Sequence, residues 1–87
     1  ITTQEGYRLQ IFESSSVEDA NRTLRKFERS LKDSVYMVFE APLYKLRLGN
    51  FVTKKEAEKQ KANLKKKGYK NIWIVRSRIE QSSKNLE

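Results

Sequence analysis

An internal repeat with an offset of 37 residues constrains the fold of this chain more than any other feature. Residues 7–11 and 44–48 both alternate apolar and long polar side chains, and each begins with a Tyr-x-Leu run. Alternation with a period of two is typical of a half-buried β-strand. Each of these strands is therefore predicted to have an apolar face and a basic face.

The same offset relates the segments that follow the two strands. Ser16 and Thr53 are each followed three residues later by an acidic residue, which is typical of a helix N-terminus. An amphipathic run comes next in both copies, and a β-branched and aromatic run ends them at residues 35–38 and 72–75. The chain therefore contains two strand-helix-strand pseudo-repeats, 7–39 and 44–76.

Two such units in tandem predict an α+β fold of order βαββαβ, the ferredoxin-like or split-βαβ arrangement. This fold is a two-layer sandwich in which a four-stranded antiparallel sheet, of order 4-1-3-2, carries both helices on one face. The expected strands are 7–12, 35–40, 43–49 and 71–76, and the expected helices are 17–32 and 54–67. Residues 1–6 are predicted to form a leader that either extends the first strand or frays. Residues 77–87 are predicted to form a polar tail, with Leu86-Glu87 left by cloning, so that the chain is a fragment of a longer protein.

The sheet face opposite the helices is left uncovered, and we call it the open face. Alternation places Leu9 and Leu46 beneath the helices. It places six residues of the two central strands on the open face: Arg8, Gln10, Phe12, Leu43, Lys45 and Arg47. The outer strands are apolar on both sides, and the position of Glu40 decides their assignment. Tyr36, Val38, Trp73 and Val75 are assigned to the open face, and Val35, Met37, Ile72 and Ile74 to the core.

The charge of the chain predicts an anionic partner. Nineteen basic and eleven acidic residues give a net charge of +8, which favours nucleic acid, lipid headgroups or a carboxylate-bearing polysaccharide. The runs Lys54-Lys55 and Lys65-Lys66-Lys67 are interpreted as solvated helix surface. No run of 18 apolar residues occurs, so we expect no membrane insertion by this segment.

The absence of His and Cys argues against catalysis and metal binding. Without them the chain has neither the commonest general base nor thiolate ligands for zinc. Glu18, Asp19 and Glu56 are expected at helix N-termini, and no carboxylate pair is expected on the open face. We therefore expect no enzymatic activity, no cofactor and no metal site.

Aromatic and polar side chains on the open face suggest a binding platform. Phe12, Tyr36 and Trp73 could stack on sugar or base rings while nearby cations meet anionic groups. The alternative is that these aromatic residues only pack the core. Lys45 and Arg47 favour function, because two long cations on a central strand lie far from any loop.

These residues resemble the SPOR (sporulation-related repeat) domain of bacterial envelope proteins, from about Gly6 to Arg76. Leu9-Gln10 matches an apolar-Gln pair in the first strand of that family, and Tyr44 to Phe51 matches a Tyr-Arg-Val-x-Val-Gly-Pro-Phe-like run in its third strand. Further matches are an Ala in each helix and a Gly that ends the second: Ala20, Ala57 and Gly68. The departures are Lys45 for the usual Arg, Asn50 for the usual Pro, and Phe12-Glu13-Ser14 for a Gly-Ser-Phe-like run.

The resemblance implies a module that binds peptidoglycan glycan strands lacking stem peptides, which accumulate at division septa. Such a module would act as a monomer in the bacterial cell envelope, within a larger anchored or secreted protein that it targets to the cell wall or septum. Loss of a stem peptide leaves a lactyl carboxylate that Lys45, Arg47 and Arg8 could pair with. The implied ligand-binding set is Arg8, Gln10, Phe12, Ser14, Leu43, Lys45, Arg47 and Trp73.

Two other functions remain open from the sequence. RNA-recognition domains share this fold and bind on the same sheet face. Their third strand carries outward aromatic residues, whereas Lys45 and Arg47 occupy those positions here, so we expect no nucleic acid partner. A protein-interaction module is the other alternative.

Overall fold

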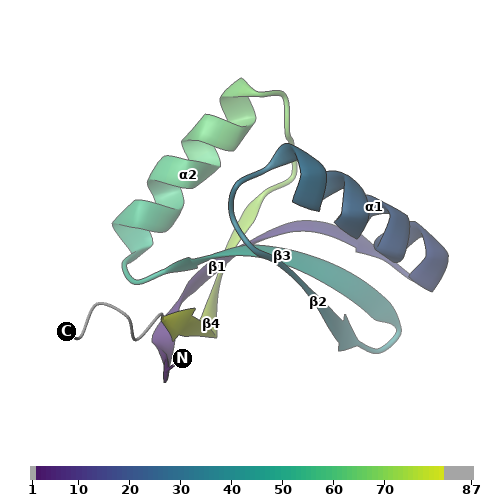
Figure 1. The fold of residues 1–87 in the computed structure, drawn as a ribbon, viewed down its shortest axis with the longest axis horizontal. Helices are drawn as coiled ribbons and strands as arrows, with labels where there is room; N and C mark the ends of the chain where they lie inside the picture. Colours follow the sequence, from purple (N-terminus) through teal and green to yellow (C-terminus); the bar gives the residue numbers. More distant parts are fainter. Residues whose placement is uncertain (1, 82–87) are drawn as a thin grey trace.

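The computed structural model describes residues 2–81, and these residues form a four-stranded sheet with two helices (Figure 1). The elements in chain order are β1 (Thr2–Ser14), α1 (Val17–Ser30), β2 (Val35–Glu40), β3 (Leu43–Phe51), α2 (Lys54–Lys66) and β4 (Trp73–Gln81). All neighbouring strands are antiparallel and the sheet order is β2-β3-β1-β4. The predicted α+β, ferredoxin-like fold is therefore confirmed, including its strand order.

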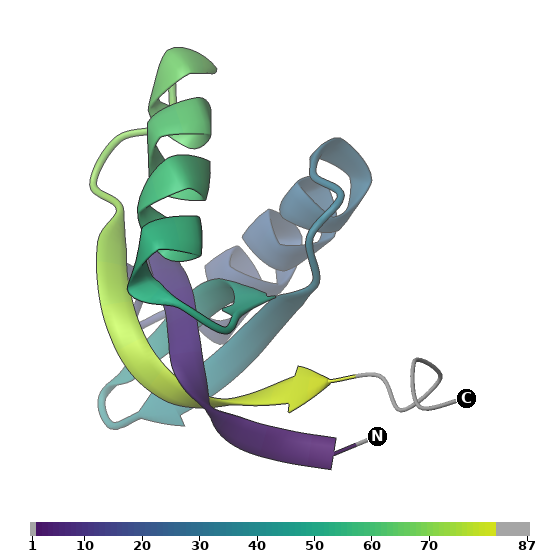
Figure 2. The ribbon, with the colours of Figure 1, turned by 90° about the vertical axis from the view of Figure 1, so that its left-hand side faces the viewer.

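The core lies between the sheet and the two helices, which cover the same sheet face (Figures 1 and 2). Leu9 and Leu46 from the central strands are fully buried, as predicted, and pack with Phe27 of α1 and Leu64 of α2. Val35, Met37 and Ile74 of the outer strands pack against this cluster, and Ile72, which directly precedes β4, belongs to it, as predicted.

The internal repeat is visible in the structure of both helices. The Ser16 hydroxyl accepts a hydrogen bond from the Asp19 N–H at 3.1 Å, and the Thr53 hydroxyl accepts one from the Glu56 N–H at 3.2 Å. Ala20 and Ala57, four residues after these caps, are both fully buried. A methyl group at each position lets the helix backbone approach the sheet closely.

Both helices end slightly before their predicted last residues: α1 ends at residue 30 and not 32, and α2 ends at residue 66 and not 67. Gly68 has a φ of +99°, and its N–H donates to the carbonyl of Lys65 at the end of α2. This is the predicted use of glycine, since its lack of a Cβ permits the left-handed backbone that stops a helix. The chain then brings the Tyr69 ring to 5.7 Å from the Phe27 ring in an edge-on contact.

Strands β1 and β4 are longer than predicted, and the whole of β4 pairs with residues 2–10 of β1. Residues 2–6 continue β1 and lie opposite residues 77–81 of β4, so the expected leader extends the strand and the expected tail begins as strand. Ile79 anchors this extension, because its side chain is fully buried and lies against Gly6, where a Cβ would collide with it. The rest of the expected tail, residues 82–87, lies outside the described residues.

Neither α1, with 14 residues, nor α2, with 13, is long and apolar enough to cross a membrane, and residues 2–81 contain no other helix.

We expect Phe27→Ala to lower the free energy of unfolding by about 3–5 kcal/mol, because the ring is only 7% exposed and fills the core between α1 and the sheet. Chemical denaturation followed by circular dichroism measures this change. Val17→Ala in the same helix is the control, since Val17 is 36% exposed and should cost less than about 1 kcal/mol. Equal losses from the two variants would contradict the placement of Phe27.

Candidate functional site on the open face of the sheet

Four side chains form a row across the open face, one from each strand. Backbone pairing sets Tyr36 opposite Arg47, Arg47 opposite Gln10, and Gln10 opposite Trp73. Directly paired residues of an antiparallel sheet point to the same face, so the predicted positions of Tyr36 and Trp73 are confirmed. The Arg47 Nε donates to Gln10 Oε1 at 3.2 Å, while the Trp73 residue is 63% exposed. We call these four residues the open-face row.

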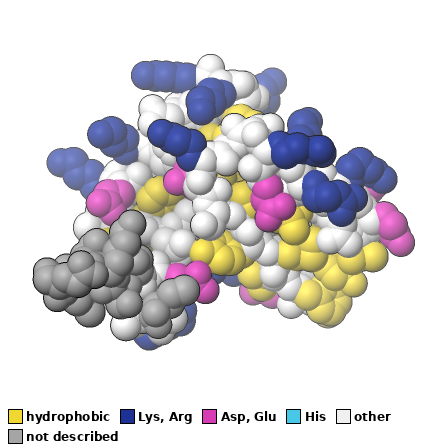
Figure 3. All heavy atoms as spheres, viewed as in Figure 1, with side chains coloured by type: hydrophobic (Ala, Val, Ile, Leu, Met, Phe, Trp, Pro, Cys, Tyr) yellow, Lys and Arg dark blue, Asp and Glu magenta, His cyan; other side chains and the backbone are white. Residues whose placement is uncertain are grey.

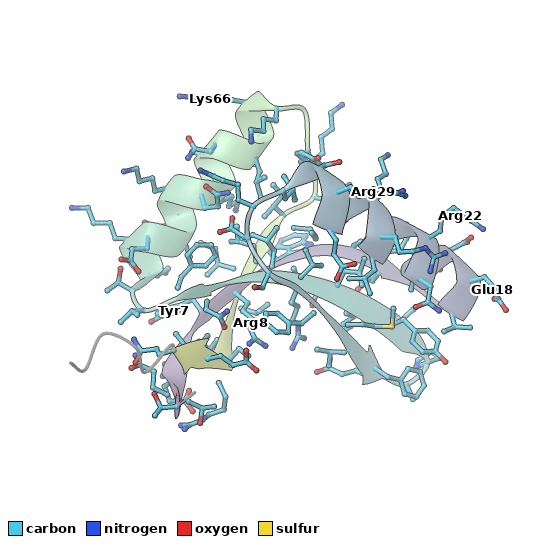
Figure 4. All side chains as sticks on the ribbon, viewed as in Figure 1. Tyr7, Arg8, Glu18, Arg22, Arg29 and Lys66 are labelled. Carbon is cyan, nitrogen blue, oxygen red and sulfur yellow. The ribbon has the colours of Figure 1, made fainter. Side chains whose placement is uncertain are left out.

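Arg8 lies on the open face, as expected, but its guanidinium is enclosed by protein. The residue is 9% exposed, and its Nε donates to the Gly49 carbonyl at 3.2 Å. Its Nη2 donates to Asn50 Oδ1 at 3.0 Å, and the guanidinium carbon lies 3.8 Å from the centre of the Tyr36 ring. Tyr7, the preceding residue, packs against the core on the other face (Figure 4). Arg8 therefore links β1 to β2 and β3.

Asn50 and Glu80 extend this network to the end of β4. The Asn50 Nδ2 donates to the Tyr36 hydroxyl at 2.8 Å, and the Tyr36 hydroxyl donates to Glu80 Oε1 at 3.2 Å. The Glu80 N–H in turn donates to Asn50 Oδ1 at 2.9 Å. Asn50 stands where the third-strand pattern would place a proline, and its amide makes three hydrogen bonds that a proline ring could not make.

Lys45 and Arg47 share one carboxylate, that of Glu40. The Lys45 Nζ lies 2.9 Å from Glu40 Oε1 and the Arg47 Nη2 lies 3.4 Å from Glu40 Oε2. The hydrogen bond and charge of Lys45, followed by the charge of Arg47, hold the pKa of Glu40 below its usual value. The Lys45 and Arg47 side chains are 20% and 15% exposed, whereas that of Glu40 is 51% exposed. The two cations are thus covered by a carboxylate that itself reaches solvent.

Phe12 does not lie on the open face, so its predicted placement was wrong. Between the pairs Gln10–Arg47 and Phe12–Leu46, β1 has one residue more than β3, which is a β-bulge. The bulge shifts the alternation, so that Phe12 packs against the core and Glu13 takes the place opposite Lys45 on the open face. Glu13 Oε1 accepts a hydrogen bond from Gln10 Nε2 at 3.3 Å.

Ser14 also faces away from the open face, because it follows the same bulge. It lies opposite Tyr44, and its hydroxyl accepts a hydrogen bond from the Ser16 N–H at 3.0 Å. This contact shapes the turn that leads into α1. Leu43 is half-buried on the open face opposite Glu40, as predicted.

A cavity of about 360 Å³ lies beside Trp73, where β1 ends and β4 begins. Its lining combines apolar side chains with cationic, anionic and amide groups: Gln10, Ile11, Phe12, Glu13, Lys70, Asn71 and Trp73. Phe12 therefore still contributes to the site, but from within the fold. Such a mixture can hold a ligand that has both an apolar face and several hydrogen-bonding groups.

Glu13, Glu40 and Asn50 are the site residues that the sequence did not reveal. Glu40 had a detectable signal, since it continues the alternation of Tyr36 and Val38 onto the open face. Asn50 was noted only as a departure from the usual proline, and Glu13 had no signal, because it takes its position from a register shift between β1 and β3.

Comparison with protein-family models matches residues 3–76 to the model described as SPOR domain. The matched segment includes β1 from its second residue, α1, β2, β3 and α2 in full, and residues 73–76 of β4. Comparisons with curated proteins and with solved structures gave no match.

We expect Arg8→Ala to lower the free energy of unfolding by about 2–4 kcal/mol, because it removes two charge-assisted hydrogen bonds and the contact with the Tyr36 ring. Urea denaturation measures the change. Arg22→Ala is the control, because the Arg22 side chain is 70% exposed and its ion pair with Asp19 contributes little. If the Arg8→Ala variant were as stable as the Arg22→Ala variant, the contacts of Arg8 with β2 and β3 would not stabilise the fold.

Proposed function

Because this chain belongs to the SPOR domain family, we propose that its open face binds peptidoglycan glycan strands that lack stem peptides. SPOR domains are peptidoglycan-binding modules of bacterial envelope and cell-division proteins. The observation that carries the finer proposal is the open-face row, in which a cation, an amide and an exposed indole occupy three adjacent strands. The module binds without catalysis and targets its parent protein to the wall or septum.

The charges of the site favour strands without stem peptides. Removal of a stem peptide leaves a free lactyl carboxylate on each muramic acid, whereas an attached peptide converts that carboxylate into a neutral amide. Lys45 and Arg47 can pair with the carboxylate by charge-assisted hydrogen bonds but gain much less from the amide. Discrimination between the two polymers therefore rests on these two side chains.

Trp73 and the adjacent cavity suit the sugar rings of the same strand. The exposed indole offers a flat apolar surface on which the C–H face of a pyranose can stack. Gln10, Glu13 and Asn71 in the cavity can exchange hydrogen bonds with hydroxyl and acetamido groups. Two strand spacings, about 10 Å, separate Arg47 from Trp73, which is of the order of one disaccharide.

Glu40 occupies the position that the ligand carboxylate would take. An incoming lactyl carboxylate would displace it, and the exposed Glu40 side chain can rotate into solvent. Lys45 has three N–H donors and Arg47 has five; Glu40 and Gln10 use one donor of Lys45 and two of Arg47. The remaining donors can meet the ligand before Glu40 leaves. Glu40 therefore holds the Lys45 and Arg47 side chains in position. It also lowers the affinity of the site for ligands whose negative charge is too weak to displace its carboxylate.

An RNA-binding role gains no support from the site. Base stacking on a sheet of this type needs several outward aromatic rings on neighbouring strands. The Tyr36 ring is covered by Arg8, Phe12 faces the core, and Trp73 is left as the exposed aromatic residue of the open-face row.

We expect Lys45→Gln/Arg47→Gln to lower affinity for amidase-treated glycan strands about tenfold or more, since each charge-assisted contact contributes roughly 1.5–3 kcal/mol when shielded. Sedimentation with purified sacculi, treated or untreated with amidase, measures the binding. Lys65→Gln/Lys66→Gln removes the same charge from α2 and should change affinity less than about threefold. Equal losses from both double variants would assign recognition to net charge.

We expect Glu40→Gln to raise affinity for the same glycan strands severalfold, because it removes the carboxylate that competes with the ligand. The lowered pKa of Glu40 means that its pairing exists above that pKa and is lost only as the pH falls through it. The difference between wild type and variant should therefore persist into mildly acidic solution and disappear only at more acidic pH. Sedimentation of both proteins with the glycan strands, from neutral to acidic pH, measures this difference. Weaker binding by Glu40→Gln at neutral pH would contradict the prediction, because Glu40 would then contribute to ligand binding and not compete with it.

A further inference from the structure

The net charge of the chain lies mainly on the helix layer and not on the open face. Residues 54–70 contain eight lysines and two glutamates, which account for six of the eight net positive charges. On the open face, the cations Arg8, Lys45 and Arg47 are matched by Glu13, Glu40 and Glu80. Figure 3 shows Lys and Arg side chains gathered over the helices, on the side away from the open face. The binding site proposed above leaves this charge without a role.

Three of these lysines form a line along the outer side of α2. Ala57 and Leu64 face the core, and at about 100° per residue the opposite side of the helix carries Lys55, Lys59 and Lys66. All three are exposed, and Lys66 extends outward from the end of α2 (Figure 4). The line extends about 17 Å at 1.5 Å per residue. We call Lys55, Lys59 and Lys66 the cationic ridge.

The lysines of this segment are not neutralised by the protein. Among residues 2–81, no ion pair involves any lysine of the segment 54–70, whereas Arg22 of α1 pairs with Asp19 at 2.8 Å. The segment also contains no arginine. Lysine ammonium groups are point charges on flexible stems, which suit anions whose positions vary, while arginine suits fixed bidentate partners.

We propose that the cationic ridge docks the domain on a lipid bilayer that contains anionic headgroups. A protruding helix contacts a flat surface along its length, and mobile headgroups can gather beneath the lysines. The ridge has neither a groove nor aromatic rings to hold a nucleic acid or a single polymer strand. The apolar side of α2 is buried in the core, so the contact is electrostatic and involves no insertion. The open face points away from the ridge, so one domain can contact bilayer and glycan together.

Sedimentation of the 87-residue chain with vesicles tests the proposal. The vesicles contain phosphatidylcholine alone or equal parts of phosphatidylcholine and phosphatidylglycerol. We expect binding to the anionic vesicles only, with release as ionic strength rises. Lys55→Gln/Lys59→Gln/Lys66→Gln should lower the partition coefficient about 100-fold, because each lysine near the surface contributes roughly fivefold. Equal binding to the two vesicle types would overturn the proposal.

Arg25→Gln/Lys26→Gln/Arg29→Gln is the matched control, since it removes three exposed charges from α1 and should cost less than about tenfold. Far-UV circular dichroism and the thermal midpoint verify that both variants fold. An equal loss in the control would assign binding to net charge. Ridge-dependent binding that is tighter to soluble poly(glycerol phosphate) or to RNA than to vesicles would also overturn the proposal.

The inference does not rest on glycan binding. The ridge variant should bind amidase-treated glycan strands as wild type does, and Lys45→Gln/Arg47→Gln should still bind anionic vesicles. Loss of both activities in the ridge variant, with the fold intact, would contradict two separate surfaces.

Discussion

The antiparallel pairing of β1 with β3 is the constraint on which the rest of the structure depends. Leu9 lies opposite Leu48 at the centre of the sheet, and both are fully buried. A shift of this pairing by one residue would move these leucines to solvent and the cations into the core, which no other contact could offset. Once the pairing is set, both helices must cover one face, and Gln10 and Arg47 must meet on the other.

The features that the sequence predicted are those with a local cause. The alternation of apolar and polar residues, the hydroxyl caps at Ser16 and Thr53, and the glycine after α2 each act within a few residues, so the fold and most of the open face could be derived. The bulges in the pairing of β1 with β3 were not predictable. Each arises where one strand has one residue more than the other between two successive backbone pairs, and no local pattern in either strand records this difference. Phe12 was misplaced for this reason alone. A second bulge lies between the pairs Tyr7–Phe51 and Leu9–Leu48, where β3 has one residue more than β1, and it contains Gly49, with a φ of +87°.

Charges illustrate the same limit. The number of cationic residues can be read from the sequence, but which of them form ion pairs or hydrogen bonds within the fold cannot. Arg8 contacts Asn50 and the Tyr36 ring, and Lys45 and Arg47 share Glu40, whereas Lys55, Lys59 and Lys66 of α2 are exposed. These pairings join residues of different strands, and side-chain geometry decides them. Net charge therefore identifies the kind of partner, and the network of hydrogen bonds identifies the surface that meets it.

The unequal distribution of charge between the two layers gives the domain a permanent electric dipole. Its positive end lies over α2, and the sheet face is nearly balanced by Glu13, Glu40 and Glu80. In the field near an anionic layer, a molecule with such a dipole turns before it makes contact. The domain would then approach with α2 toward the anionic layer and with Arg47, Gln10 and Trp73 on the far side. Long-range electrostatic attraction would therefore orient the binding face before contact, so that fewer collisions occur in an unproductive orientation.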